Sequence, residues 1–354
     1  GELRDAGYWK RHVEATVNFM GAMQHIDQTF GTVLELGPQG ALIPVVKRNM
    51  IGPKLPVVIT ASMAAPVQGK AMTNLGKAIG LVLSSPWGVA LKDKHPAVLA
   101  PPLPSLPPPG LQASAPAPTE AKAEPTKPTP TPAGPPSSSS TTAVPAAAKG
   151  AVPATAPGAL LLRLGGADHA QLKTDASKHA SHFQKSPQDA AALCKQLSTP
   201  RDAAAAVEWT VAGHDAAAVA EQLNAGPPAA TVFAGVKKAV EQGRDKLLLA
   251  FSGLPEGASM KGWWLPAYRT DAVFKAAMER MCVHAAKEHN VELQKALSLD
   301  LGPGEKAREV ETGLQQAVIY VVQVALTEAY AACGVRADAV IGHSFGEYAA
   351  AVAA

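Results

Sequence analysis

Residues 342–347 contain the side chain best suited to do chemistry in this chain, because they read Gly-His-Ser-Phe-Gly-Glu. A short apolar run at 339–341 precedes them, and an alanine-rich stretch follows. An apolar strand that ends in Gly-x-Ser-x-Gly and continues into a helix is typical of a nucleophile elbow, a tight turn that exposes a serine hydroxyl. The pattern therefore predicts that Ser344 is a nucleophile in acyl chemistry.

The residues beside Ser344 have predicted roles of their own. Glycines at 342 and 346 allow the strand and the helix to pass close together, which puts the serine at the helix N-terminus, where the dipole favours a developing alkoxide. The backbone amide of Phe345 would donate to an oxyanion. A histidine next to the serine in sequence cannot easily reach its neighbour's hydroxyl across the turn, so we expect His343 to shape the substrate pocket.

The bare Gly-x-Ser-x-Gly pattern also arises by chance in a chain with 30 glycines, so its surroundings decide its meaning. Residues 342–351 resemble the GHSxGE motif of the acyltransferases of fatty-acid and modular polyketide synthases, the malonyl-CoA:acyl-carrier-protein transacylase family. Residues 312–326 resemble the family helix written TxxxQPAxFxxQxAL. In this resemblance Gln316 matches the active-site glutamine, a substrate-binding residue, and Ala317 replaces the usual proline.

A third stretch resembles the C-terminal end of the same family. It comprises residues 8–12, then Val17 and Phe19, and then 34–38. His12 falls where many members carry asparagine. This tail precedes the elbow, whereas a single acyltransferase would carry it afterwards. We therefore expect the chain to hold the end of one acyltransferase and the start of a second, both cut from a longer polypeptide.

The resulting domain prediction has four parts. Residues 1–95 form the C-terminal part of a first acyltransferase and its post-domain segment, and residues 246–354 form the N-terminal part of a second. Residues 159–245 form a small α/β adapter. Residues 96–158 consist mainly of Pro, Ala, Ser and Thr, and bury too little apolar surface to offset their ordering entropy, so we expect a disordered linker.

The fold class predicted from this organisation is α/β, with a mainly parallel, α/β-hydrolase-like sheet in the acyltransferase parts. Apolar runs predict strands at 32–36, 56–60, 160–164, 208–211, 246–251 and 339–341. Helical spacing predicts helices at 13–23, 41–49, 70–83, 172–183, 190–197, 216–223, 271–288 and 312–333. The strands at 32–36 and 246–251 are expected to bring the tail and head parts together.

Composition excludes several other classes. The net charge of +3 and the charged fraction of 17% argue against a nucleic-acid partner. The three cysteines lack the spacing of a zinc site or a disulfide framework, so we expect no metal and a reducing location, the cytoplasm or an organelle stroma. No run reaches the roughly 18 apolar residues of a membrane span.

The resemblance implies acyl transfer from an acyl-CoA, most often malonyl-CoA, through an acyl-serine to the phosphopantetheine thiol of an acyl carrier protein. It implies no bound cofactor, and it implies neighbouring synthase domains such as a ketosynthase as further partners. The family's catalytic histidine and carboxylate-binding arginine match no position here, so we expect the chain to be inactive alone. Leu254 stands where the family carries an oxyanion-binding glutamine, a change expected to lower the rate about a hundredfold to a thousandfold.

Two alternatives remain open. An α/β-hydrolase thioesterase also uses a Gly-His-Ser-x-Gly elbow, but Glu347, the Gln316 helix and the acyltransferase-like tail disfavour it. A degenerate acyltransferase that serves as a docking scaffold fits Leu254 better. The scaffold predicts that Ser344 is never acylated, whereas the enzyme predicts an acyl-serine.

Overall fold

The computed structural model describes residues 7, 10, 19–26, 29–37, 41–49, 58–61, 71–94, 160–197, 205–213, 215–254, 260–302 and 305–354. The predicted linker at 96–158 lies outside the described residues, as do His12, Val17, Pro38 and most of the tail motif at 8–12.

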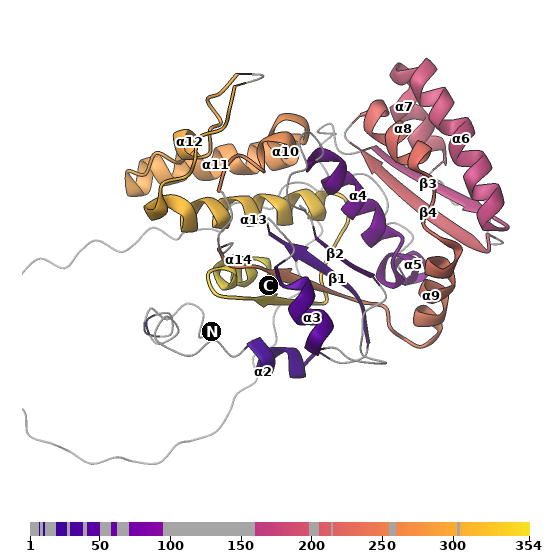
Figure 1. Cartoon of the computed structure of the whole chain (residues 1–354), viewed down its shortest axis with the longest axis horizontal. Coiled ribbons are helices and arrows are strands. Elements are labelled where there is room, and N and C mark those ends of the chain that lie inside the picture. The colour runs from indigo at the N-terminus through magenta and orange to yellow at the C-terminus, as the bar shows by residue number, and fades with distance from the viewer. Residues whose placement is uncertain are drawn as a thin grey trace, which may run out of the picture. The chain divides into compact units, whose positions relative to one another are not determined.

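A four-stranded parallel sheet carries the predicted nucleophile (Figure 1). Its strand order is β2 (Val58–Ala61), β1 (Phe30–Leu36), β5 (Lys246–Phe251) and β6 (Ala339–Gly342). All three pairings are parallel, which confirms the predicted α/β class with a mainly parallel sheet. The expected meeting of the two distant apolar strands is also confirmed, because Leu34 pairs with Leu249 across β1 and β5.

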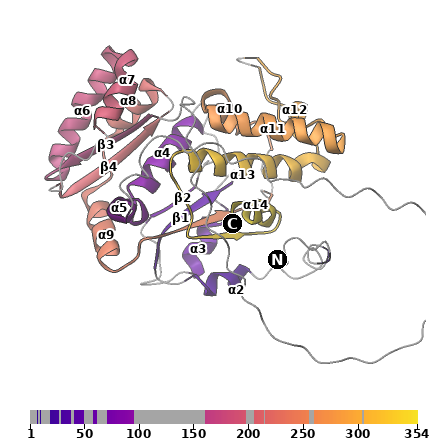
Figure 2. The same ribbon diagram turned by 180° about the vertical axis from the view of Figure 1, so that it is seen from behind.

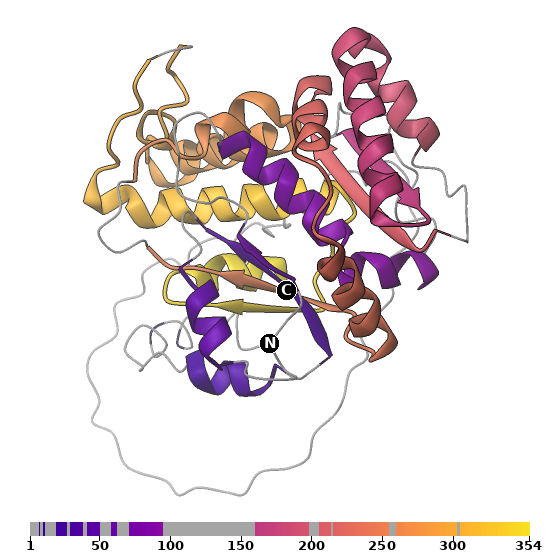
Figure 3. The same ribbon diagram turned by 45° about the vertical axis from the view of Figure 1, so that its right-hand side comes forward.

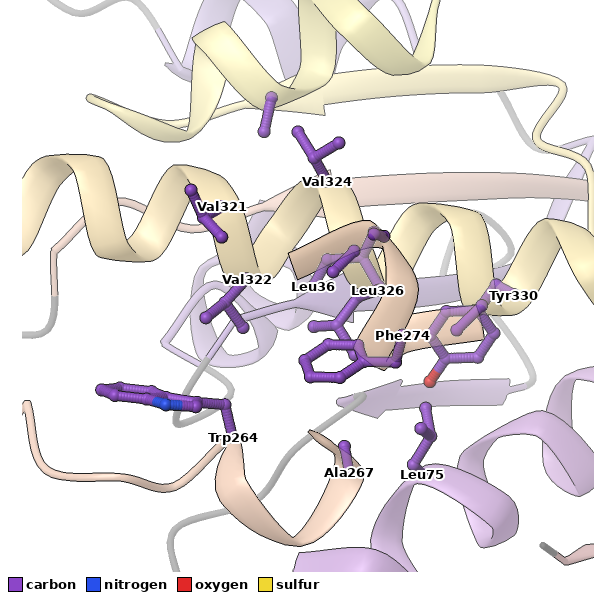
Figure 4. Packing of buried hydrophobic residues seen from close by; sticks show 14 of the residues in the cluster. Leu36, Leu75, Trp264, Ala267, Phe274, Val321, Val322, Val324, Leu326 and Tyr330 are labelled. Carbon is purple, nitrogen blue, oxygen red and sulfur yellow. The ribbon is translucent and has the colours of Figure 1, made fainter. Parts of the chain in front are cut away.

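Helices cover both faces of this sheet, which explains why β1 and β5 are mostly apolar and buried, with Thr32 and Glu35 as the polar exceptions in β1. On one face, Leu34, Leu36 and Phe251 pack with α4 (Ala71–Leu83), α10 (Leu265–Thr270), α11 (Ala272–His289) and α13 (Gln315–Ala332). Figure 4 shows Leu326 and Tyr330 of α13 beside Phe274 of α11. On the other face, Leu248 and Ala250 pack with α2 (Phe19–Gln24) and α3 (Ile43–Asn49) or the residues next to them.

A second, antiparallel sheet is formed by β3 (Leu160–Gly166) and β4 (Val207–Gly213) (Figure 2). One face packs with α6 (His169–Lys185), α7 (Ala190–Leu197) and α8 (Ala216–Ala225), and η3 (Pro187–Asp189) joins α6 to α7. Helix α4 lies against β4 (Figure 3), where the Thr210 amide donates to Ser84 Oγ at 2.8 Å. A Cβ on Gly80 would lie 2.6 Å from the Thr210 oxygen, so this contact requires glycine.

Four helices were not among the sequence predictions: α5 (Pro86–Lys94), α9 (Ala230–Glu241), α10 and α12 (Leu293–Ala296). Helices α5, α10 and α12 are short or begin with proline, so their periodicity is weak and tertiary packing provides most of their stability, whereas the 12-residue α9 has no such explanation. The helix predicted at 312–333 divides into η4 (Thr312–Leu314) and α13, and α14 (Gly346–Ala353) follows β6. Among the described residues, no helix is long and apolar enough to cross a membrane.

Candidate active site

The predicted nucleophile elbow has the expected strand–turn–helix geometry. Ser344 lies between β6 and α14 with a backbone φ of 53°, in the left-handed region that non-glycine residues rarely occupy. A Cβ on Gly342 would lie 2.3 Å from the Glu347 Cα, and a Cβ on Gly346 would lie 2.3 Å from the Phe251 oxygen. The two glycines therefore permit the tight turn that leaves Ser344 exposed.

Hydrogen bonds hold the elbow against β5. The His343 amide donates to the Phe251 oxygen at 2.9 Å, and the Gly346 amide donates to the His343 oxygen at 3.0 Å. The turn is therefore anchored on both sides of the serine. Among the described residues, no acceptor takes the Phe345 amide or the Ser344 hydroxyl. The Phe345 amide is thus free to donate to an oxyanion, as the sequence predicted.

The loop after β5 lies directly against the nucleophile. A Cβ on Gly253 would lie 2.9 Å from the Ser344 Cβ and 3.3 Å from its Oγ. Leu254 packs its side chain against the hydrophobic core, so that side chain offers no donor. Its backbone keeps a peptide N–H, as every residue except proline does. The expected hundredfold to thousandfold loss of rate at this position stays a prediction.

His343 contacts the N-terminal segment. Its ring packs edge-on against the ring of Phe19, with centroids 5.6 Å apart and an interplanar angle of 83°. Phe19 belongs to α2 and is buried. A residue more than 300 positions earlier in the sequence therefore fixes one side of the turn that carries Ser344. The contact gives His343 a position beside the nucleophile, where it was expected to shape the pocket.

Gln316 lies exposed in the first turn of α13. Among the described residues, no hydrogen bond joins its side chain to another group, whereas its neighbour Gln315 donates to the Val310 oxygen at 3.3 Å. The structure therefore does not connect Gln316 to Ser344, and its substrate-binding role stays a prediction.

Among the described residues, no hydrogen bond joins the Ser344 hydroxyl to a histidine. Four of the described histidines, His179, His182, His284 and His289, lie on α6 or α11, and His169 on α6 bonds to the Pro228 oxygen. His25 follows α2 and is exposed. The part of the chain that the structure describes also holds no group of three His, Cys, Asp or Glu residues able to bind a metal ion.

Two buried polar residues near the site were missed in the sequence. Glu35 lies on β1, fully buried, and its Oε2 accepts from the amides of Leu42 and Ile43 at 2.9 and 3.0 Å. Gln323 lies on α13, also fully buried, and bonds to the ends of β1 and β5. The available signal was a polar residue inside an otherwise apolar strand or helix, since such a group needs partners that only the fold supplies.

Burial raises the pKa of Glu35 above its ordinary value of 4.5, against the opposing effect of its backbone hydrogen bonds. The unfolded chain then releases this proton at a lower pH than the folded chain. The contribution of Glu35 to stability is complete below the unfolded pKa and is lost as the pH rises through the folded pKa.

We therefore expect the wild type to lose stability relative to Glu35→Gln as the pH rises above 4.5. Each unit of pKa difference corresponds to about 1.4 kcal/mol in the free energy of unfolding. Glutamine keeps an acceptor for the two amides but does not ionise. Urea unfolding of both proteins between about pH 3.5 and pH 8 measures the difference. If the free energies of unfolding of the two proteins changed with pH in parallel, the pKa of Glu35 would be the same in the folded and unfolded chains, and the prediction would be wrong.

Comparison with known proteins gives matches to one domain type. Residues 251–354 match the family described as "Acyl transferase domain". Orsellinic acid synthase armB of Armillaria mellea is 30% identical over 122 residues, which is 34% of this chain and 5% of armB. Polyketide synthase GfsE of Streptomyces halstedii is 34% identical over 118 residues, which is 33% of this chain and 3% of GfsE. The matches therefore span only a small part of these synthases.

Solved structures give weaker similarity. The acyl transferase domain of SpnD, in complex with 2-(pent-4-yn-1-yl)malonyl, aligns with a TM-score of 0.37 and 24% identity, over 55% of this chain and 44% of that one. The acyl transferase domain of ZmaA also aligns with a TM-score of 0.37, at 19% identity, over 56% of this chain and 44% of that one.

Proposed function

We propose, from the premise that residues 251–354 match the acyl transferase domain family, that Ser344 accepts an acyl group from an acyl-CoA and passes it to a carrier protein. Malonyl-CoA is the expected donor, and the phosphopantetheine thiol of an acyl carrier protein is the expected acceptor. The observation that carries the proposal is the elbow itself. An exposed serine at φ 53° lies against the glycine loop that follows the neighbouring strand.

The proposed reaction has two steps, the acylation of Ser344 and the transfer of the acyl group to the carrier thiol. Ser344 Oγ attacks the thioester carbonyl while its proton passes to a general base, and the coenzyme A thiolate leaves once the tetrahedral intermediate collapses to the acyl-serine. The protonated base then gives its proton to the departing coenzyme A thiolate. In the second step, the carrier thiol attacks the ester while its proton passes to the same base, which returns that proton to the Ser344 oxygen as it leaves. The Phe345 amide, with the Leu254 amide as a second candidate donor, would stabilise the oxyanion of both intermediates.

A scaffold function is the second candidate, and one observation favours it. The described residues place no histidine other than His343 in a recorded contact near Ser344, so the described part of the site lacks a general base. A serine without a base is a weak nucleophile. If the chain serves only to dock neighbouring synthase domains, Ser344 will remain unmodified under all conditions.

We expect the chain, incubated with malonyl-CoA and imidazole as an external base, to gain one malonyl group at Ser344. Without imidazole we expect no transfer to a carrier protein. Intact-mass measurement followed by peptide mapping locates the adduct. Ser344→Ala should show none. Ser298→Ala is a matched control, because Ser298 also has a positive φ, 56°, but lies at the end of α12, and it should acylate as the wild type does.

The cysteines should not compete for the label. Burial raises the pKa of Cys194 and Cys282 to about 11 and that of Cys333 to about 12, so these thiols stay protonated at neutral pH. An adduct that persists in Ser344→Ala would contradict the proposed nucleophile. No adduct on the wild type with imidazole present would favour the scaffold. Replacing malonyl-CoA by acetyl-CoA or methylmalonyl-CoA in the same assay tests the acyl group.

A further inference from the structure

Gln323 is a buried polar side chain that hydrogen-bonds to both the N-terminal and the C-terminal segment of the parallel sheet. It lies fully buried on α13, among apolar neighbours such as Val322 and Val324. Its Nε2 donates to the Leu36 oxygen at 2.9 Å and to the Ser252 oxygen at 2.6 Å. Both N–H bonds of one amide are thus committed to two backbone carbonyls, which meets the need of a buried donor for partners.

The two carbonyls belong to strand ends that are far apart in sequence. Leu36 ends β1, in the N-terminal segment, and Ser252 directly follows β5. The Ser252 amide also donates to the Leu36 oxygen, at 3.4 Å, so this oxygen receives two donors from the same region. Gln323 therefore acts as a clamp across the carboxyl ends of neighbouring parallel strands, the edge at which open α/β sheets bind ligands.

The Ser252 carbonyl and the Gly253 amide belong to the same peptide unit, and Gly253 is the spatial neighbour of Ser344. Because a peptide unit is planar, fixing the Ser252 oxygen also fixes the orientation of the Gly253 amide. Gly253 lies against Ser344, since its Cβ would approach the Ser344 Cβ to 2.9 Å. The Ser252 oxygen would also lie 2.7 Å from a Cβ on Gly346, so it is in close contact with the start of α14.

We infer that Gln323 is a positioning residue that couples the docking of β1 to the placement of the glycine loop beside Ser344. The inference goes beyond the proposed function, and only its kinetic readout rests on that function. Loss of the amide frees the Ser252 carbonyl, and the Gly253–Leu254 loop then loses its fixed distance from the serine. Displacement of this loop lowers acylation even when substrate still binds.

Gln222 provides a matched control for a purely structural role. It too is a buried glutamine that bridges backbone carbonyls, because its Nε2 donates to the Ala212 oxygen at 2.5 Å and to the Ala218 oxygen at 3.4 Å. It lies on α8 beside β4, in the antiparallel sheet. Gln222→Met and Gln323→Met each remove a side-chain amide with little change in side-chain volume. Only Gln323→Met removes a hydrogen bond to the Ser252 carbonyl, beside the loop that contacts Ser344.

Residue-resolved hydrogen exchange on the full chain tests this coupling between β1 and the Gly253 loop, and it does not require the chain to be catalytically active. The two reporters are the Ser252 amide, bonded to the Leu36 oxygen, and the His343 amide, bonded to the Phe251 oxygen. In Gln323→Met we expect both to exchange about tenfold faster than in Gln222→Met, after correction for the global stability of each variant. Equal exchange in the two variants would overturn the inference.

The kinetic readout is the rate of malonyl adduct formation with imidazole. We expect Gln323→Met to lower the maximal rate about tenfold or more, with little change in the malonyl-CoA concentration for half-saturation. Gln222→Met should match the wild type. A rate loss shared by both variants would overturn the inference.

If the wild type forms no adduct, the proposed function fails, and the exchange comparison alone decides the role of Gln323. Gln323→Asn, which keeps an amide on a shorter side chain, replaces Gln323→Met if the latter does not fold.

Discussion

Gly346→Ala is expected to eliminate acylation of Ser344 and to destabilise the chain by about 1–3 kcal/mol or more. The added Cβ would lie 2.3 Å from the Phe251 oxygen and 2.7 Å from the Ser252 oxygen. Both are backbone atoms at the end of β5 or directly after it, so no flexible side chain can move aside. Helix α14 must then move away from β5, and it carries the Ser344 turn with it. Thermal unfolding and the malonyl-adduct assay measure the two effects.

Gly313→Ala is the control for this substitution. Gly313 lies in η4, and a Cβ there would meet no heavy atom within 4 Å. We expect its melting temperature and adduct yield to stay close to those of the wild type. If Gly346→Ala behaved in the same way, the close passage of α14 over β5 would not be needed to hold the nucleophile.

The second large effect concerns the N-terminal segment. A polypeptide of residues 155–354 alone is expected not to fold cooperatively, because it lacks β1 and β2, half of the parallel sheet. Strand β5 would lose one of its two parallel partners, and Leu248 and Ala250 would lose the cover that Val33 and Val46 provide. Exposed apolar faces and unpaired strand edges favour aggregation over folding. Circular dichroism and thermal unfolding of the shortened polypeptide measure the outcome.

Two controls separate this explanation from a general effect of shortening. Co-expression of residues 1–103 as a second polypeptide should restore a folded complex, because the strand pairing needs no covalent connection. Replacing residues 104–154 by a Gly/Ser segment of equal length should leave the melting temperature unchanged, since this unit holds none of the described helices or strands. Cooperative unfolding of 155–354 alone, at the wild-type temperature, would show that β1 is dispensable.

These experiments bear on how the candidate site is assembled. The N-terminal segment contributes the Leu36 carbonyl that Gln323 binds and the Phe19 ring that packs against His343. The C-terminal segment contributes Ser344 and the Gly253 loop. The described surroundings of Ser344 therefore draw on two segments separated by more than 100 residues of sequence. A site built in this way loses its geometry when either segment is displaced.

The elements around Ser344 could be predicted because their signals are local. An apolar run followed by Gly-x-Ser-x-Gly indicates a strand, a turn and a helix within about a dozen residues. The same is true of the apolar run of β5 and the long periodic helix α13. The order of the strands is a different matter, because pairing joins β1 to β5 across more than 200 residues. The sequence analysis predicted only that these two apolar strands meet, from their composition and the family resemblance, and it gave no strand order, because backbone hydrogen bonds alone do not specify the partner.

The sequence by itself determined the tight turn at Ser344, its flanking glycines and the free amide of Phe345, since each follows from the conformation of six consecutive residues, and it predicted Ser344 as the nucleophile. Only the tertiary structure decided the roles of Glu35, Gln323 and Phe19. Each of these side chains acts through a partner brought near by folding: the amides of α3, the ends of two strands, and the ring of His343. A buried polar group in a sequence reveals that a partner must exist, because an unpaired one is costly, but its identity is a property of the fold.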